Sequence, residues 1–298
     1  MILLYHGIVA DEAPPERSCA AQALPAAAFV RHLEWIRRRR RIVPMAEYLE
    51  SRRRRRIAAL TFDDGLARTF ENAEPYLRAE GIPATFFVST AHVETRDLLW
   101  FPALDALCFE GEYASVDAGG DVLPLGTLEE KRRARRRLGT LARESGDPAA
   151  FSAALLARHP LSERALAEYR GMPPEAVRGA AAGSLFEIGS HTRTHPYLPL
   201  QSLPAQRREI AGSRAELERI SGTPVRYFAY PGGDYDRTAL ALVAEGGYEA
   251  AFATVSRRLG DERLEIERIG IYSAPLWKVA LKEAGIVPVA RRLGVQIG

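Results

Sequence analysis

Two adjacent carboxylates stand where a hydrolytic enzyme could use them. Asp63 and Asp64 lie in TFDDG, residues 61–65, at the end of an apolar run. Neighbouring carboxylates repel each other unless a cation or a shared proton compensates. The pair is therefore a candidate for binding a metal ion and for removing a proton from water. The alternative is an ordinary Asp-Gly turn.

A pair of histidines follows later in the chain. His191 and His195 flank the segment HTRTH, which comes just after the apolar run 185–189, and the chain has only six histidines. Histidines at i and i+4 can share one face of a helical turn and bind a single cation, and imidazole nitrogen suits zinc and related metals. The alternative is a pair of surface histidines in a threonine-rich loop.

A third segment, FAYPGG at 228–233, ends with two glycines after a proline. Such a sequence forms a tight turn with exposed backbone N–H groups, and these can stabilise a developing oxyanion. Gly232 is the candidate donor, and the alternative is a plain loop turn.

The elements that must position these residues are short apolar strands alternating with amphipathic helices. Strands that alternate with helices predict a parallel sheet with right-handed crossovers. About seven such units predict an α/β fold, a distorted (β/α) barrel. The predicted strands are 2–6, 57–62, 84–89, 185–189, 225–230, 250–254 and 266–271, and the predicted helices include 26–41, 66–80, 204–221 and 237–246.

One long segment interrupts this alternation. Residues 95–182 are rich in Ala, Leu and Arg and contain no convincing strand, except for a short hairpin near 112–123. The segment predicts a mostly helical insertion between two barrel strands. We expect it to cap the barrel mouth within a single domain that spans 1–298.

The three chemical segments all follow predicted strands. In parallel barrels, catalytic groups gather where the strands end, at the C-terminal face. Asp64, His191 and His195 could there supply three metal ligands and leave positions open for water and substrate, as a catalytic metal site requires.

These motifs resemble those of the polysaccharide deacetylases with the NodB homology domain, carbohydrate esterase family 4. The resemblance covers most of the chain and implies the same barrel and a divalent metal, with zinc expected first and cobalt or nickel as alternatives. It implies Asp63 as general base and Asp64, His191 and His195 as metal ligands. The implied reaction removes an N-acetyl or related acyl group from a sugar unit of a polysaccharide or its precursor, and removal of an O-acyl group is the less favoured alternative. The motifs that carry the resemblance are TFDDG (61–65), HTRTH (191–195), EIGSHT (187–192) and EIAGSRAELE (209–218).

The chain departs from that family pattern at several positions. Ala229 stands where many members have an arginine that holds the catalytic aspartate, and Gly232 stands where an aromatic residue is frequent. Arg268, in the last predicted strand, is the candidate replacement for the arginine, and a plain ion pair is the alternative.

No histidine follows His195, so the general acid of many members is missing from its usual place. His6, at the end of the first strand, is the candidate donor, as in the branch that includes biofilm poly-N-acetylglucosamine deacetylases. The alternative for His6 is a core histidine bonded to backbone.

The expected mechanism uses one ionised and one protonated group. Asp63 would remove a proton from water, and His6 with a near-neutral pKa would donate one to the leaving amine. This pairing predicts a bell-shaped pH–rate profile. Two other functions stay open: a deformylase or amidase acting on a non-sugar amide, and a non-catalytic glycan-binding protein with a decayed site.

Composition sets further bounds. The chain has 298 residues, 47% of them hydrophobic and 27% charged, as in ordinary globular proteins. No stretch approaches the ~20 apolar residues of a membrane helix. The start, MILLYHGIV, lacks the basic region of a secretory signal, so a cytoplasmic location is expected. Cys19 and Cys108 alone predict no disulfide framework.

Net charge is small at +3, but basic residues form runs at 37–41, 52–56 and 131–137. Such runs could contact nucleic acid, anionic lipid or an acidic glycan. The simpler interpretation is solvated helix faces and loops in a chain that prefers arginine. No aromatic residues interleave with the runs to stack on bases. We therefore expect an acylated sugar or polysaccharide as the partner and no nucleic acid, while the sequence gives no indication of oligomeric state.

Overall fold

A parallel sheet forms the centre of the computed structural model, which describes residues 1–13, 23–95 and 97–283. The sheet runs in the order β12-β11-β10-β9-β6-β5-β1-β13, and each of these pairings is parallel. Most of its strands are buried along their whole length, which explains their nearly continuous apolar sequences. The strands are β1 (Ile2–Tyr5), β5 (Ile57–Phe62), β6 (Ala84–Val88), β9 (Phe186–Ser190), β10 (Tyr227–Ala229), β11 (Ala250–Ala253), β12 (Ile266–Glu267) and β13 (Ile269–Gly270).

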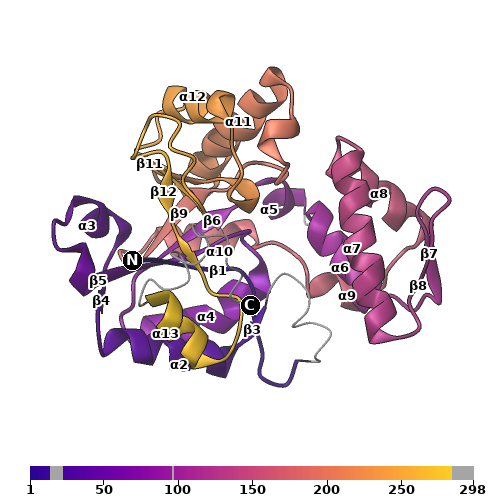
Figure 1. The fold of residues 1–298 in the computed structure, drawn as a ribbon, viewed down its shortest axis with the longest axis horizontal. Coiled ribbons are helices and arrows are strands. Elements are labelled where there is room, and N and C mark those ends of the chain that lie inside the picture. The colour runs from indigo at the N-terminus through magenta and orange to yellow at the C-terminus, as the bar shows by residue number, and fades with distance from the viewer. Residues whose placement is uncertain (14–22, 96, 284–298) are drawn as a thin grey trace.

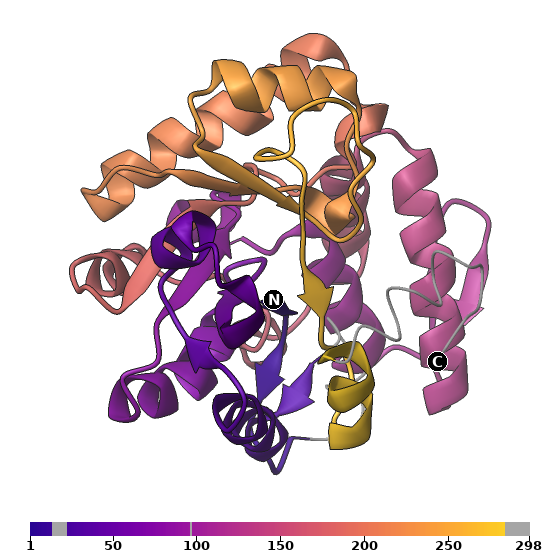
Figure 2. The same ribbon diagram turned by 60° about the vertical axis from the view of Figure 1, so that its left-hand side comes forward.

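The two ends of this sheet are neighbouring pieces of one chain segment. β12 pairs with β11, and β13 pairs with β1 at the opposite end of the strand order, with only Arg268 between the two short strands. In Figure 2 the golden final strand segment runs between the orange strands and the indigo N-terminal strands. The sheet is thus nearly closed, which confirms the distorted (β/α) barrel and its roughly seven strands.

Helices on the outside of the sheet bury the core. They contribute side chains such as Phe29, Leu77, Val177, Leu217 and Val243 to the main apolar cluster. The helices are α2 (Ala26–Arg37), α3 (Met45–Glu50), α4 (Ala67–Ala79), α10 (Pro174–Ala181), α11 (Leu203–Ser221), α12 (Arg237–Glu245) and α13 (Leu276–Glu283).

The helix predicted over 26–41 is shorter than expected. It ends at Arg37, and the chain turns before entering β4 (Arg41–Ile42), which pairs with the start of β5. Strand pairing satisfies the backbone groups of 41–42, which explains why helical periodicity gives way there. A second small parallel pair joins β2 (Ile8–Val9) to β3 (Leu24–Pro25).

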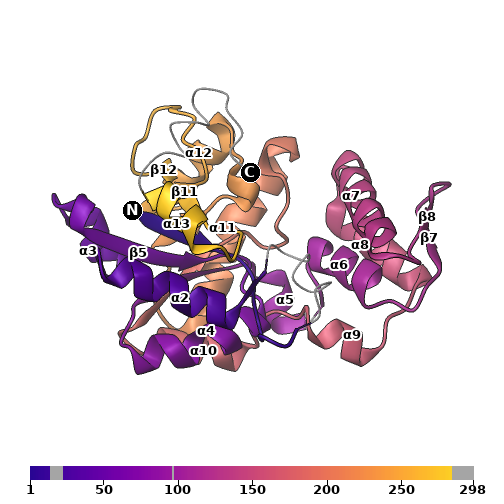
Figure 3. The ribbon, with the colours of Figure 1, turned by 60° about the horizontal axis from the view of Figure 1, so that its bottom comes forward.

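The segment between β6 and β9 contains the predicted helical insertion (Figures 1 and 3). Its antiparallel hairpin lies close to the predicted place, and a separate apolar cluster including Leu107, Leu138, Leu155 and Tyr169 holds the insertion together. α10, by contrast, packs against β9 and α11 of the barrel. The elements are α5 (Ala91–Thr95), α6 (Trp100–Phe109), β7 (Ser115–Asp117), β8 (Val122–Pro124), α7 (Leu128–Glu144), α8 (Pro148–Arg158) and α9 (Glu163–Ala167).

The cysteines and the search for membrane-spanning helices bear on two further expectations from the sequence. Cys108 is a buried free thiol, and Cys19 lies outside the described residues. Of the helices in the described ranges, none has the length and apolar character to cross a bilayer.

Candidate active site

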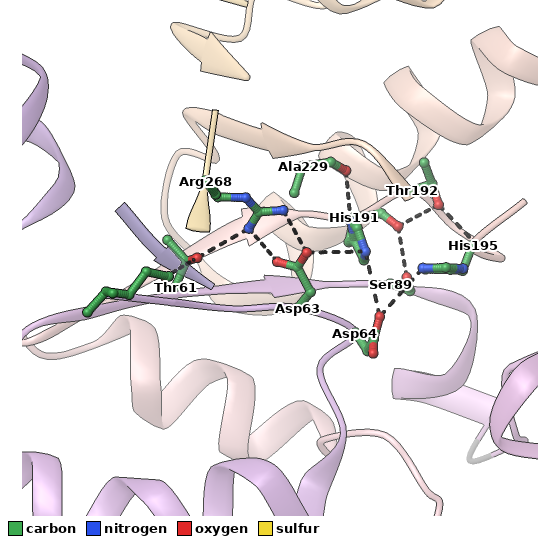
Figure 4. A network of polar contacts seen from close by, with 10 residues as sticks. Thr61, Asp63, Asp64, Ser89, His191, Thr192, His195, Ala229 and Arg268 are labelled. Carbon is green, nitrogen blue, oxygen red and sulfur yellow. Dashed lines mark hydrogen bonds and ion pairs between the residues drawn. The ribbon is translucent and has the colours of Figure 1, made fainter. Parts of the chain in front are cut away.

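The C-terminal ends of the strands bring the candidate residues together (Figure 4). Tyr5 of β1 pairs with Phe62 of β5, so His6 and Asp63 follow at the same edge of the sheet. Ser190 of β9 pairs with Phe228 of β10, so His191 follows beside Ala229. Because parallel strands end at one face, residues far apart in sequence become neighbours there.

Asp64, His191 and His195 lie close enough together to hold one ion. Each offers a ligand atom, and the three atoms lie within 4.8 Å of one another. Asp64 Oδ1 is 3.6 Å from His191 Nε2 and 3.5 Å from His195 Nε2. His191 Nδ1 lies 2.7 Å from the Ala229 carbonyl oxygen. A carbonyl can only accept, so Nδ1 carries the proton and Nε2 presents a lone pair to Asp64.

The chemistry of these atoms fits a divalent metal. Asp64 Oδ1 and His191 Nε2 are buried and have no hydrogen-bond partner among the described residues. Burial and the neighbouring Asp63 carboxylate raise the pKa of Asp64 well above its usual range. Burial lowers the pKa values of His191 and His195, so both imidazoles are neutral, as metal ligands must be. Two imidazoles and one carboxylate form a donor set that suits zinc.

The histidine segment is not the helical turn that its spacing suggests. Thr192 and His195 have φ values of 66° and 56°, and Asp64 has 76°. A left-handed residue interrupts a right-handed helix, so the two rings converge through a strained loop instead. The Thr192 hydroxyl accepts the backbone N–H of His195 at 3.1 Å, which helps to hold this loop.

Arg268 forms a bidentate ion pair with Asp63. Nη1 donates to Oδ1 at 2.6 Å and Nη2 donates to Oδ2 at 2.7 Å, and both side chains are buried. Nη1 also lies 3.2 Å from the Thr61 hydroxyl. Burial alone would raise the pKa of Asp63, but the Arg268 charge, aided by His191, lowers it to about 2. The arginine comes from the break between β12 and β13, where its backbone N–H donates to the Ala253 carbonyl.

His6 lies beside Asp63 at the end of β1, half-buried, with its ring centroid 5.5 Å from that of Tyr272. Burial lowers the pKa of His6 to about 4, even though the Asp63 carboxylate acts in the opposite direction. The near-neutral pKa expected for His6 is therefore wrong. Desolvation of the charged imidazolium outweighs the attraction of a carboxylate that is already neutralised by Arg268.

Gly232 lies in η4 (Pro231–Gly233), the turn that follows β10, with a φ of 62° and an exposed backbone. Within the described part of the chain, no hydrogen bond joins Gly232 to Asp63, Asp64 or the two histidines. Its role as an oxyanion donor stays a prediction.

Several supporting residues were not identified from the sequence. Glu209 of α11 accepts the backbone N–H groups of Arg193 and Thr194 at 2.8 and 2.9 Å, and so holds the histidine loop. Trp100 of the insertion donates from Nε1 to the His195 carbonyl at 2.8 Å. Glu209 is the first residue of the segment EIAGSRAELE, which resembles the family, but the sequence did not indicate that its side chain holds the histidine loop. No sequence pattern pointed to Trp100.

A comparison with family models decides the assignment of the chain. The model described as polysaccharide deacetylase matches residues 50–251, which include TFDDG, the histidine loop and the turn after β10. The chain belongs to the polysaccharide deacetylase family. Membership supports carbohydrate deacetylation by a hydrolase, and the family generally uses a divalent metal, which the Asp64, His191 and His195 cluster could hold.

Solved structures show the same fold. A polysaccharide deacetylase from Bacillus cereus, BC0361, has a TM-score of 0.59 at 17% identity, covering 95% of this chain and 68% of its own. IcaB from Ammonifex degensii has a TM-score of 0.58 at 19% identity, covering 95% of each chain. The deacetylase PplD of Streptococcus pyogenes, in complex with acetate, has a TM-score of 0.52 at 18% identity and covers 91% of each chain. A comparison with curated proteins finds no match.

Proposed function

We propose that this protein is a metal-dependent hydrolase that removes an N-acetyl group from a sugar unit of a polysaccharide or its precursor. One observation carries the proposal: three candidate metal ligands, two of which offer buried atoms without a hydrogen-bond partner among the described residues, lie directly beside a carboxylate that an arginine keeps ionised. His191 Nε2 is 3.6 Å from Asp64 Oδ1 and 3.8 Å from Asp63 Oδ2. The candidate metal ligands and the candidate general base therefore lie next to one another. A site that is no longer under selection for catalysis would be expected to lose at least one of these residues.

Asp64, His191 and His195 would hold the metal. When bound, a divalent metal lowers the pKa of water and offsets negative charge on the acyl oxygen. Zinc is the first expectation, and cobalt or nickel are alternatives. The Ala229 carbonyl fixes the ring of His191, and the Trp100 and Thr192 contacts fix the backbone of His195. Such support holds ligands in place for catalysis.

Asp63 would remove the proton from the attacking water. Arg268 keeps the carboxylate ionised and fixes its plane, so an oxygen remains directed toward the ligand cluster. His6 is neutral at pH 7, because its pKa is about 4. It therefore acts as an acid only after it takes up the proton that Asp63 removed, and passes it to the leaving amine. The water's hydroxyl ends on the acyl carbon and its proton ends on the amine.

Replacing His6 tests this proton path. We expect His6→Ala to lower kcat by about 10²-fold or more, the usual scale for a lost acid–base group, while the metal content stays unchanged. His159→Ala, in the insertion and remote from the ligand cluster, is the matched control and should stay near wild type. Wild-type kcat in His6→Ala would mean that the proton reaches the amine by another route.

The pH dependence distinguishes this path from an acid that is protonated at rest. The lowered pKa of His6 means that its proton is already lost above about pH 5, so raising the pH from 6 to 8 removes none. We expect no decline of kcat with rising pH across this range, in place of the falling limb that a near-neutral His6 would give. Profiles of wild type and His6→Ala at saturating substrate would show this; a wild-type limb falling near pH 6.5 and absent from the variant would contradict it.

The substrate class needs a direct assay. A panel of N-acetylated, N-formylated and O-acetylated sugar oligomers, together with small non-sugar amides, separates a sugar deacetylase from a deformylase or amidase. We expect acetate release from N-acetylated oligomers to exceed release from the other compounds. Preferential formate release, or cleavage of non-sugar amides alone, would favour the alternative enzymes. Binding of oligomers without any release would favour a glycan-binding protein.

A further inference from the structure

Two arginine runs come together on the side of the barrel opposite the candidate active site. Arg41 of β4 pairs with Ile57 at the start of β5, whereas Asp63 follows the other end of that strand. The Arg40 side chain donates to the Arg55 carbonyl oxygen. We call residues 37–41 and 52–56 the arginine face. In Figure 1, α3 and β4 lie at one end of the molecule and the insertion at the other, and Figure 3 shows the same separation of α3 from the insertion.

Charge is strongly segregated at this face. Residues 37–56 contain ten arginines and two glutamates, a net charge of +8, whereas the whole chain carries +3. The other 278 residues therefore carry −5. Concentrating like charges costs free energy unless an opposite charge is near, and it creates a local potential that attracts anions.

A solvated helix face is the simpler explanation for basic runs, and it fits the run at 131–137 well. That run lies on α7, where Arg135, Arg136 and Arg137 pair with Asp105, Glu129 and Asp121. A smaller share of the arginines of the arginine face is compensated in this way.

At the arginine face, only part of the charge has a nearby carboxylate. Arg37 pairs with Glu80 and Arg41 with Glu47. Residues 52, 53, 55 and 56 are exposed arginines without an ion pair in the described part of the chain, and η2 (Arg54–Arg56) buries no side chain. These arginines therefore do not stabilise the fold by packing.

We propose that the arginine face binds the surface of a bilayer that contains anionic phospholipid. A guanidinium group can donate two hydrogen bonds to two oxygens of one phosphate. Clusters of four to eight basic residues on one surface are typical of proteins that bind anionic lipids. The aromatic rings nearby are covered: Arg39 stacks over Trp35 at 3.9 Å, and Arg54 lies over the buried Tyr48 at 5.6 Å. Bases of nucleic acid would find no free ring to stack on, whereas lipid headgroups need none.

The orientation has a functional consequence. With the arginine face on the bilayer, the opposite ends of the strands, which carry Asp63 and Asp64, point away from it. The site would then face glycan in the aqueous phase next to the membrane. Binding by this face does not depend on the proposed deacetylation.

Vesicle binding by the full chain tests the inference. We expect sedimentation with vesicles of phosphatidylcholine mixed with phosphatidylglycerol, little with phosphatidylcholine alone, and weakening by salt. Each basic side chain contributes about fivefold in affinity, so changing Arg52, Arg53 and Arg55 together to Gln should weaken binding about 100-fold. The same change at Arg133, Arg136 and Arg137 of α7 is the matched control and should alter binding less than about threefold. Release of acetate from soluble oligomers should be unchanged in both variants.

Three results would overturn the inference. The first is no sedimentation with the mixed vesicles. The second is equal loss of binding in the two triple variants, which would show a response to net charge alone. The third is tighter binding of duplex DNA or of an acidic polysaccharide than of mixed vesicles at the same salt concentration, which would reassign the face to that polymer.

Discussion

Asp63→Asn should retain its metal and lose about 10²–10⁴-fold in kcat. The amide cannot accept the proton that Asp63 takes from water, and a general base contributes roughly 10²–10⁴-fold. Metal content should not change, because the ligand cluster consists of Asp64, His191 and His195. Acetate release at saturating substrate and elemental analysis of the same preparation measure both quantities.

The variant also disturbs the buried pair with Arg268, so folding must be checked separately. An uncompensated buried guanidinium destabilises a protein by roughly 3–5 kcal/mol. Circular dichroism at the assay temperature would establish the folded fraction to which kcat is referred. Asp121→Asn, an exposed aspartate paired with Arg137 in the insertion, is the matched control and should keep full activity. A folded Asp63→Asn protein with wild-type kcat would exclude Asp63 as the base.

Arg268→Met should lose both activity and stability. The side chain keeps its length, but Asp63 is left buried without its partner, so the pKa of Asp63 rises because burial is no longer opposed. We expect the unfolding free energy to fall by roughly 3–5 kcal/mol. We also expect kcat to fall by about 10²-fold or more, because the base is neutral for more of the time and no longer held in one plane.

The pH dependence of this stability loss has a definite sign. In the wild type, the pKa of Asp63 is lowered to about 2, so its pairing stabilises the fold above the usual carboxyl pKa near 4 and is lost as the pH falls toward 2. The difference in melting temperature between wild type and Arg268→Met should therefore narrow as the pH drops from 7 to 3. Arg207→Met, at an exposed pair with Glu245, should shift stability by less than about 0.5 kcal/mol at either pH. An unchanged melting temperature in Arg268→Met would show that the pair does not hold Asp63.

Strand positions could be read closely from the sequence because parallel strands are buried on both faces. Apolar runs such as 57–62 and 250–254 correspond to β5 and β11 to within one residue. The ends of these strands then pointed to one face, which is why Asp63, Asp64, His191 and His195 could be grouped without coordinates. The contact between Arg268 and Asp63 joins residues 205 positions apart and was accessible only as a hypothesis.

Other features depend on tertiary contacts that no local pattern encodes. The histidine loop is left-handed at Thr192 and His195, and Glu209 from a separate helix holds its backbone, so the i, i+4 spacing suggested a helical turn that does not form. The pKa of His6 depends on how deeply neighbouring chain buries it, and burial is decided by packing. Trp100 of the insertion bonds to the His195 carbonyl oxygen, but the composition of the insertion predicted only that it is mostly helical.

One experiment on the purified protein measures whether turnover depends on a bound metal. Elemental analysis before and after treatment with a chelator would be followed by an acetate-release assay on an N-acetylated oligomer, then by stepwise return of zinc, cobalt or nickel. We expect about one metal ion per chain, loss of activity on removal, and recovery that saturates near one equivalent. Full turnover by metal-free protein would contradict metal dependence. Metal that binds equally well after His195→Ala would contradict the assignment of His195 as a ligand.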